Sequence, residues 1–404
     1  MKRYDSYKDS GVKWLGEIPS HWEVKRLGSF FTERKVKVSD KEYEPLSVTK
    51  LGVFPQWENV AKTNDGDNRK LVKRGDFVIN SRSDRKGSSG VSDRDGSVSL
   101  INIVLQPRKT IIASYTNYLL KSYKFIEEYY RNGHGIVADL WTTRFDEMKM
   151  IKVAIPSIKE QEAIANYLDA ATSKIDEAIA QQQKMIDLLN ERKQIIINNA
   201  VTKGLDPNVK MKPSGIDWIG DIPEHWEIRR MRYLCKITTG NKDTINRVDD
   251  GLYPFYVRSP KVERINSYSY DGEAVLMAGD GVGAGKVFHY VNGKFDYHQR
   301  VYCFYEIEMI KAKLLYYYMQ NLFKYVIEQL SAKSTVDSVR LNMIQDFVVC
   351  IPSIKEQIEI VNFIDKEFAN IEKAIQISLN QISLLQERKQ IIINDVVTGK
   401  VKVV

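Results

Sequence analysis

The stretch "AGDGVGAGKVFHY" at residues 278–290 has the glycines and the lysine of a phosphate-binding loop. The nucleotide-hydrolysing pattern GxxxxGK[ST] needs glycine at 280 and serine or threonine at 287, where a hydroxyl binds magnesium. Asp280 and Val287 stand there instead, so the sequence does not predict nucleotide hydrolysis. Two interpretations stay open: a loop whose backbone approaches DNA with Lys286 on a phosphate, or a structural turn.

A second glycine- and serine-rich stretch, "NSRSDRKGSSGVSDRDG" at 80–96, carries several basic side chains. Arginine often contacts phosphates, and a bidentate arginine is the commonest reader of guanine. The candidates for DNA contact in this stretch are Arg82, Arg85, Lys86 and Arg94. The aspartates at 84, 93 and 95 dilute the positive charge, so a plain solvated loop is the alternative.

Further candidates lie beside expected strands. "DYHQRVYCF" at 296–304 contains His298, Gln299 and Arg300, and glutamine reads adenine as arginine reads guanine. Arg144 and Arg340 occupy matching positions, 196 residues apart, just before an expected closing strand. For these two arginines, contact with a phosphate and pairing with a nearby acid are both open.

Catalytic and metal-binding patterns are not found in the sequence. The five histidines are scattered and the three cysteines form no CxxC pair, so neither zinc nor a disulfide framework is expected. No NPP[YF]-type methyltransferase motif and no nuclease-like cluster of acids with a lysine is present. The net charge of +8 is compatible with a polyanionic partner. The beginning of the sequence shows no apolar signal segment, so a cytoplasmic location is expected.

The chain repeats itself. "IPSIKEQ" stands at 155–161 and again at 351–357. Two further pairs accompany it: "SGVKWLGEIPSHWEVKR" (10–26) with "SGIDWIGDIPEHWEIRR" (214–230), and "ERKQIIIN" at 191–198 and 387–394. The repeat predicts two copies of one plan, each with a fixed start and end around a variable middle.

The two middles, about 30–140 and 235–336, read as mixed helix and strand. "GDFVIN" (75–80) and "GEAVLM" (272–277) are plausible buried strands. Residues 114–133 and 310–330 space their apolar side chains as amphipathic helices do. We expect the middles to share a fold and to differ in surface.

Each copy ends in a long helix. After Pro156 and Pro352 no proline or glycine appears until Gly204 and Gly399. Apolar residues recur there in steps of three and four, a heptad-like seam that each helix can bury against the other. We expect the two helices to pair antiparallel. Ser157 and Ser353 are candidate helix caps, and we expect the "IPSIKEQ" junction to contact a partner or the opening segment of the other copy.

The charged letters near the end of each helix recur without change. Simple helix termination is one interpretation, and a partner surface is the other. The candidates for partner binding are Glu191, Arg192, Lys193, Gln194, Glu387, Arg388, Lys389 and Gln390.

The order of these motifs, written twice, resembles the specificity (S) subunit of Type I restriction-modification systems, and the linker "GLDPNVKMKPSGIDWIG" (204–220) is also typical of that family. The resemblance covers essentially the whole chain. It implies an α+β fold with two globular mixed α/β target-recognition domains in pseudo-twofold arrangement, separated by two long antiparallel coiled-coil helices. The expected domains are 1–156 and 204–352 for recognition, and 157–203 and 353–404 for the spacer helices with the C-terminal tail.

The resemblance further implies binding of double-stranded DNA with a bipartite target, two methyltransferase subunits and an endonuclease/translocase subunit. The chain itself is expected to be non-catalytic and to carry no cofactor. S-adenosylmethionine belongs to the partner methyltransferase, and ATP and Mg to the partner endonuclease. Two other classes stay open: a coiled-coil scaffold joining two protein-binding modules, and a stand-alone DNA methyltransferase or nuclease.

Overall fold

The computed structural model describes residues 2–56, 66–135, 141–331 and 338–403. The chain forms two compact units that each combine a globular part with portions of two long helices, α4 (Ile158–Lys203) and α7 (Ile354–Val397). The first unit comprises 1–182 and 380–404, and the second comprises 183–379.

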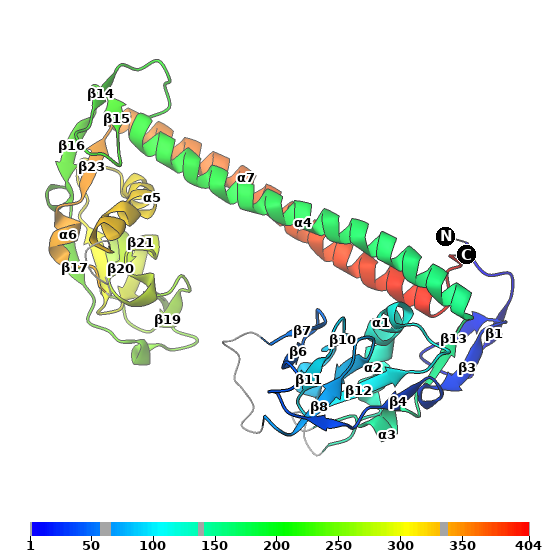
Figure 1. Ribbon diagram of the computed structural model, residues 1–404. Coiled ribbons are helices and arrows are strands. Elements are labelled where there is room, and N and C mark those ends of the chain that lie inside the picture. Colours follow the sequence, from blue (N-terminus) through cyan, green and yellow to red (C-terminus); the bar gives the residue numbers. More distant parts are fainter. Residues whose placement is uncertain (1, 57–65, 136–140, 332–337, 404) are drawn as a thin grey trace. The chain divides into compact units, whose positions relative to one another are not determined.

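Within each unit α4 and α7 lie side by side and run in opposite directions, as predicted (Figure 1). Lys389 of α7 pairs with Asp176 of α4 in the first unit, and Lys193 of α4 pairs with Glu372 of α7 in the second. Both helices are rich in good helix formers, and their burial follows the predicted steps of three and four residues. The seam therefore holds the two helices together within each unit.

The globular part of the first unit is built on a four-stranded sheet of order β10-β9-β12-β4. Its strands are β4 (Phe31–Glu33), β9 (Phe77–Asn80), β10 (Ser89–Val91) and β12 (Asn102–Pro107). Smaller sheets lie beside it, formed by β5 (Lys37–Val38), β8 (Arg69–Val72) and β11 (Gly96–Val98), and by the hairpin of β6 (Leu46–Val48) and β7 (Val53–Pro55). Helices α1 (Ala113–Lys121) and α2 (Tyr123–Arg131) contribute Tyr115, Leu119 and Phe125 to its core.

The globular part of the second unit is a six-stranded sheet of order β17-β22-β20-β21-β18-β19. The strands are β17 (Lys236–Thr239), β18 (Tyr253–Tyr256), β19 (Glu263–Ile265), β20 (Tyr270–Ala278), β21 (Phe288–Tyr297) and β22 (Val301–Tyr305). Helix α5 (Ala312–Ser331) buries Leu315, Tyr318 and Leu322 in the same core as Val275 and Phe304 of the sheet.

The two middles share a fold, as expected: the order β4-β12-β9-β10 in the first unit matches β17-β22-β20-β21 in the second. The predicted strands at 75–80 and 272–277 are β9 and β20. The predicted helix at 114–133 differs, because Ser122 adopts an extended conformation and caps a new helix, its hydroxyl accepting from the Phe125 N–H. The single expected helix is therefore two.

A second set of strands forms the frame of each copy: a hairpin within the opening segment, and a pair that joins the opening segment to the closing strand. In the first copy these are β1 (Tyr7–Asp9) with β2 (Glu17–Pro19), and β3 (Glu23–Arg26) with β13 (Lys152–Ile155). In the second they are β14 (Met211–Pro213) with β15 (Asp221–Pro223), and β16 (Glu227–Arg230) with β23 (Val348–Ile351). The short helices α3 (Phe145–Met148) and α6 (Leu341–Gln345) precede the closing strands. Trp22 and Trp226 are buried in this frame.

Candidate nucleic-acid interface

Strands β9 and β20 end in turns that occupy the same place in their units. The backbone N–H of Ser81 donates to Ile101 and its carbonyl accepts from Thr143. Gly279 makes the same two bonds, with Arg300 and Val339. A one-turn 3-10 helix follows in each case, η2 (Ser83–Arg85) and η6 (Gly281–Gly283). This correspondence is invisible in the sequence because the two stretches share almost no residues.

In the second unit, three charged side chains meet at this turn. Arg258 donates from Nη1 to Oδ1 of Asp280 at 3.1 Å, and Nε of Arg300 lies 3.6 Å from the other carboxylate oxygen. The Arg258 and Arg300 side chains remain 46% and 64% exposed, while the Asp280 side chain is largely covered. One carboxylate thus holds two arginines at the edge of the sheet. The sequence-based prediction included Arg300 and missed Arg258, which lies outside the glycine-rich and polar stretches.

The neighbouring turn from β21 to β22 brings the other predicted residues to the same edge. The Gln299 amide donates to Asp243 at 2.7 Å, and its side chain is exposed. His298 is only 2% exposed, and its Nδ1 accepts the backbone N–H of Arg300 at 3.0 Å. Burial lowers the pKa of His298, which keeps the ring neutral and able to accept this bond. His298 therefore supports the turn from beneath, whereas Gln299 and Arg300 face outward.

Lys286 closes the glycine-rich stretch. Its backbone N–H donates to Gly283, and its side chain is exposed. The stretch is a tight turn, as one of the two interpretations held, and Lys286 is available for a phosphate beside it. The two interpretations are therefore compatible.

The corresponding turn of the first unit carries different side chains. Asp84 and Arg85 are exposed at η2, and Arg82, before it, is half-buried. Lys86 is held by Glu127 of α2 at 2.7 Å and lies over the ring of Tyr130. Arg82 and Arg85 thus share the edge, whereas Lys86 is engaged with a neighbouring helix.

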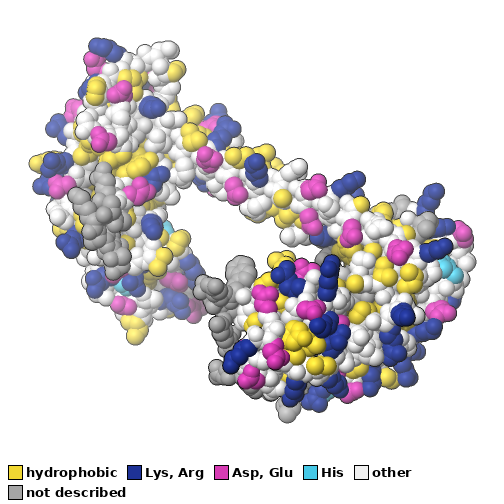
Figure 2. All heavy atoms as spheres, viewed as in Figure 1, with side chains coloured by type: hydrophobic (Ala, Val, Ile, Leu, Met, Phe, Trp, Pro, Cys, Tyr) yellow, Lys and Arg dark blue, Asp and Glu magenta, His cyan; other side chains and the backbone are white. Residues whose placement is uncertain are grey.

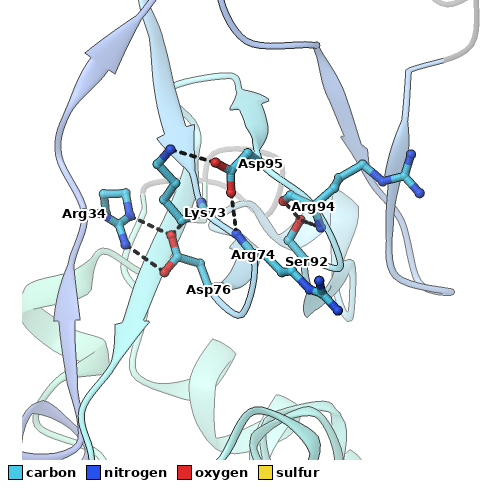
Figure 3. A network of polar contacts seen from close by, with 7 residues as sticks. All are labelled: Arg34, Lys73, Arg74, Asp76, Ser92, Arg94 and Asp95. Atoms are coloured by element: carbon cyan, nitrogen blue, oxygen red, sulfur yellow. Dashed lines mark hydrogen bonds and ion pairs between the residues drawn. The ribbon is translucent and has the colours of Figure 1, made fainter.

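Arg94 lies at the opposite end of the sheet, because β10 runs antiparallel to β9 and the chain returns to the start of β9 before it reaches residue 94. A polar network fixes the turns at that end (Figure 3). Arg34 binds Asp76 through two hydrogen bonds of 2.6 and 3.0 Å, and Asp95 accepts from the Lys73 side chain and from the Arg74 backbone. Arg94 itself pairs with Asp93, so the predicted set of residues at 80–96 is divided between two ends of one sheet.

The predicted arginines before the closing strands are both exposed. Arg144 and Arg340 stand at the N-termini of α3 and α6. Arg144 lines a cavity of about 470 Å³ that Ser81 also lines and in which basic side chains outnumber acidic ones: Lys35, Lys37, Lys70 and Arg144 against Glu33 and Asp146. Since Ser81 begins the turn described above, this basic cavity adjoins the edge that carries Arg82 and Arg85. Figure 2 shows lysine and arginine side chains spread over the visible face of the first unit, interleaved with acidic ones.

The repeated junction binds the opening segment of its own copy and not that of the other copy, which corrects one of the two expectations. The other expectation, a contact between the junction and a partner subunit, stays a prediction. Glu160 accepts from Tyr4, Trp22 and His21, at 2.7, 3.1 and 2.9 Å. Glu356 accepts likewise from Trp226 and His225, at 3.2 and 2.9 Å. The preceding strands β13 and β23 each pair with a strand of the same opening segment, so a junction glutamate can reach only its own copy.

The next residue of the junction holds the variable middle. Gln161 donates to the carbonyl of Thr110 and accepts from the N–H of Ile112, and Gln357 does the same with Met309 and Lys311. One tyrosine from each middle then bonds an aspartate on the long helix: Tyr118 with Asp169 at 2.6 Å, and Tyr317 with Asp365 at 2.5 Å. Adjacent glutamate and glutamine side chains thus connect the frame, the long helix and the middle.

The candidate partner residues divide into inward and outward ones. Lys193 and Lys389 form the pairs between the helices described above, and Arg192 lies 3.8 Å from Glu367. The remaining five are exposed: Glu191, Gln194, Glu387, Arg388 and Gln390. Glu191 and Gln194 also line a cavity beside Tyr316 and Tyr317, and Arg388 lines a cavity beside Tyr167. Beside them, Leu188 and Ile195 in one copy match Leu384 and Ile391 in the other, and all four are about half exposed. Figure 2 shows hydrophobic side chains at the surface along these helices.

Within the described ranges no group of three or more histidine, cysteine, aspartate or glutamate side chains is arranged to hold a metal ion. Among the described helices none has the length and apolar character to cross a membrane. Cys303 and Cys350 are buried, and burial raises the pKa of both thiols, which opposes a nucleophilic role.

Comparison with known proteins gives a consistent result. A family model for the Type I restriction modification DNA specificity domain matches residues 19–186 and 223–381. The chain is 32% identical to the Type I restriction enzyme EcoDI specificity subunit of Escherichia coli, over 45% of this chain and 40% of that protein. It is 23% identical to the Type I restriction enzyme MjaVIII specificity subunit of Methanocaldococcus jannaschii, over 98% of this chain and 97% of that protein.

Solved structures resemble the chain over almost its whole length. One was solved to explain complex assembly and conformational transition of the type I R-M system; it has a TM-score of 0.71 and 13% identity and covers 95% of this chain and 99% of its own. The HsdS subunit from Thermoanaerobacter tengcongensis has a TM-score of 0.51 and 14% identity, with 95% and 98% covered. At these identities the likeness concerns the fold.

Proposed function

Since this chain belongs to the family of Type I restriction-modification DNA specificity proteins and is a specificity subunit, we propose that its two units read the two halves of one split DNA target. The observation that carries the proposal is the shared sheet with unlike side chains at the same turn. A common scaffold that presents Arg82, Asp84 and Arg85 in one unit and Asp280, Val282 and Arg300 in the other suits two different half-sites.

The proposed DNA contacts lie at one edge of each sheet. In the first unit they are Arg82, Arg85 and Arg144. In the second they are Arg258, Lys286, Gln299, Arg300 and Arg340. Lys86 and His298 do not contact DNA in this proposal, because Lys86 pairs with Glu127 and His298 is buried under its turn. Arg94 lies at the opposite end of the first unit's sheet. Exposed arginines can bind phosphates or guanine, whereas the covered groups fix the turns that present them.

The proposed partners are two methyltransferase subunits, one on each copy of an outward helix surface, and an endonuclease/translocase subunit. The surface, here called the repeated helix face, consists of Leu188, Glu191 and Ile195 in one copy and Leu384, Glu387 and Ile391 in the other. Exposed residues are under no packing constraint, so an identical exposed pattern in both copies favours two equivalent partners. We propose that the chain performs no catalysis and works in the cytoplasm, where its DNA lies.

One experiment tests the reading of a split target. The chain is expressed with its partner methyltransferase in a host that lacks this modification, and the methylated bases are sequenced. We expect one motif with two defined halves and a spacer of fixed length. The absence of any motif, with the complex assembled and S-adenosylmethionine supplied, would overturn the proposal.

Measurements of DNA and S-adenosylmethionine binding by the purified chain distinguish the specificity subunit from a protein-binding scaffold and from a stand-alone methyltransferase. Gel shifts at several salt concentrations are expected to show affinity for DNA that falls steeply with salt. A scaffold without a DNA role would show no such binding. S-adenosylmethionine bound by the isolated chain would favour a stand-alone methyltransferase instead.

A further inference from the structure

The tip of η6 in the second unit exposes a lone apolar side chain. Val282 is 96% exposed and stands between Gly281 and Gly283. Scattered apolar residues on a surface need no explanation by themselves. This one projects from the edge that carries two arginines held by a single carboxylate, and its position is fixed by the backbone around it.

The backbone of the turn is tightly constrained. Gly281 and Gly285 have φ of 69° and 63°, a region that favours glycine. At Gly283 a Cβ atom would lie 2.4 Å from the carbonyl oxygen of Arg258, which follows β18. The turn therefore packs directly against the backbone at the end of β18. The N–H groups of Ala284 and Gly285 donate to Gly281 and Ala278, at 3.0 and 2.9 Å. Val282 is therefore presented by a rigid turn and loses little freedom on contact.

The side chains around Val282 are of the kinds that contact DNA. Asp280, two residues before it, holds Arg258 and Arg300, and Gln299 lies on the adjoining turn. In the first unit the residue at the position of Val282 is Asp84, followed by Arg85, and both are exposed. The same scaffold position is thus apolar in one unit and charged in the other.

We propose that Val282 contacts the 5-methyl group of a thymine in the half-site read by the second unit, with Arg258 and Arg300 anchoring the turn to the same groove. Thymine is the base that presents a methyl group in the major groove, and apolar side chains recognise it there. Asp84 and Arg85 give the first unit a polar contact at the equivalent position. This inference rests on the proposed function and adds a specificity-determining residue to it.

The test uses the full chain assembled with its methyltransferase partner. First, methylated bases are sequenced for wild type and for Val282→Ser. We expect the variant to lose preference at one thymine of one half-site and to leave the other half unchanged. The matched control is Leu252→Ser, because Leu252 is also exposed (71%) but precedes β18, at the end of that strand opposite to Arg258. Leu252→Ser should keep the wild-type motif.

Second, binding is measured on duplexes in which each thymine of the target is replaced in turn by deoxyuridine, which lacks only the methyl group. For wild type we expect one replacement, in one half-site, to weaken binding about fivefold, the order expected for one buried methyl group. Val282→Ser should bind the thymine and deoxyuridine duplexes equally.

The outcomes distinguish the role of Val282 from the recognition of DNA by the whole chain. An unchanged motif for Val282→Ser, an equal effect of deoxyuridine on wild type and variant, or a half-site without thymine on either strand would overturn the role of Val282 and leave the reading of DNA intact. A wild-type complex that recognises no sequence would overturn both.

Discussion

The indole Nε1 of Trp22 lies 3.1 Å from Oε1 of Glu160, and this bond joins the opening segment of the first copy to the first turn of α4. The same carboxylate accepts from Tyr4 and His21, and it is almost fully buried. Three donors therefore depend on one side chain at the point where frame and helix meet.

Glu160→Ala should destabilise the first unit by about 2–3 kcal/mol, because it leaves buried donors without an acceptor. Urea unfolding of the full chain measures this change. Glu162→Ala is the matched control, since Glu162 is exposed on the same helical turn, and its effect should stay within about 0.5 kcal/mol. Equal stabilities for the two variants would contradict the structural role of Glu160.

Glu356 should make the second unit sensitive to acid. Burial alone would raise the pKa of its carboxyl group, but hydrogen bonds from Ser353, His225 and Trp226 lower the pKa from 4.5 to about 2. A depressed folded-state pKa contributes stability that is complete above about pH 4.5 and is lost as the pH falls toward 2. Glu356→Gln should be less stable at neutral pH and should lose less stability between pH 4.5 and 2. Parallel stability profiles for wild type and variant would count against this account.

The Arg34–Asp76 pair is more buried than the Lys73–Asp95 and Arg94–Asp93 pairs drawn with it in Figure 3. Asp76 is 3% exposed on its side chain, so Asp76→Ala leaves a covered guanidinium unpaired and should cost about 3–5 kcal/mol. The exposed pair of Arg94 and Asp93 provides the comparison: Asp93→Ala should leave the stability almost unchanged, because solvent screens this pair. Thermal unfolding of both variants measures the difference, and a similar loss in each would refute the ranking.

Arg144 should contribute to affinity without sequence preference. Arg144→Ala is expected to weaken binding to cognate and unrelated duplexes alike and to reduce the slope of log K against log salt by about one. The comparison is Arg94→Ala, at the other end of the sheet, which should leave the slope unchanged. If the salt slope changed for Arg94→Ala and not for Arg144→Ala, the DNA would bind at the opposite end of the sheet.

The repeated helix face should bind the methyltransferase. Leu188→Asp with Ile195→Asp should remove one bound partner, and the same changes at Leu384 and Ile391 the other, because a charge in an apolar contact is costly. Mass measurement of the assembled complex counts the partners. Glu162→Asp, which keeps the charge on an exposed site outside this face, serves as the control. Full occupancy in the fourfold variant would place the partner elsewhere.

The sequence predicted the frame well and the interface only in part. The seams of α4 and α7 are long and periodic, so their pairing within each unit followed from spacing alone. The shared sheet of the two middles could be guessed from "GDFVIN" and "GEAVLM", but the equivalence of Ser81 and Gly279 could not, since it consists of backbone hydrogen bonds. Arg258 escaped notice because its task depends on Asp280, more than twenty residues away. Arg94 looked like a neighbour of Arg82, and only the antiparallel return of β10 separates them.

The hydrogen bonds by which Gln161 and Gln357 hold the middles have an evolutionary consequence. Each glutamine binds a carbonyl and an N–H of the main chain, groups that every sequence except proline supplies. These main-chain bonds ask for no particular side chain from the residues they join, whereas the tyrosine–aspartate bond of each copy and the Lys313–Asp365 pair do. Mutations at the outer edge of a middle therefore leave the glutamine hydrogen bonds intact. New target preferences can arise while the attachment of the middle to the long helix stays the same.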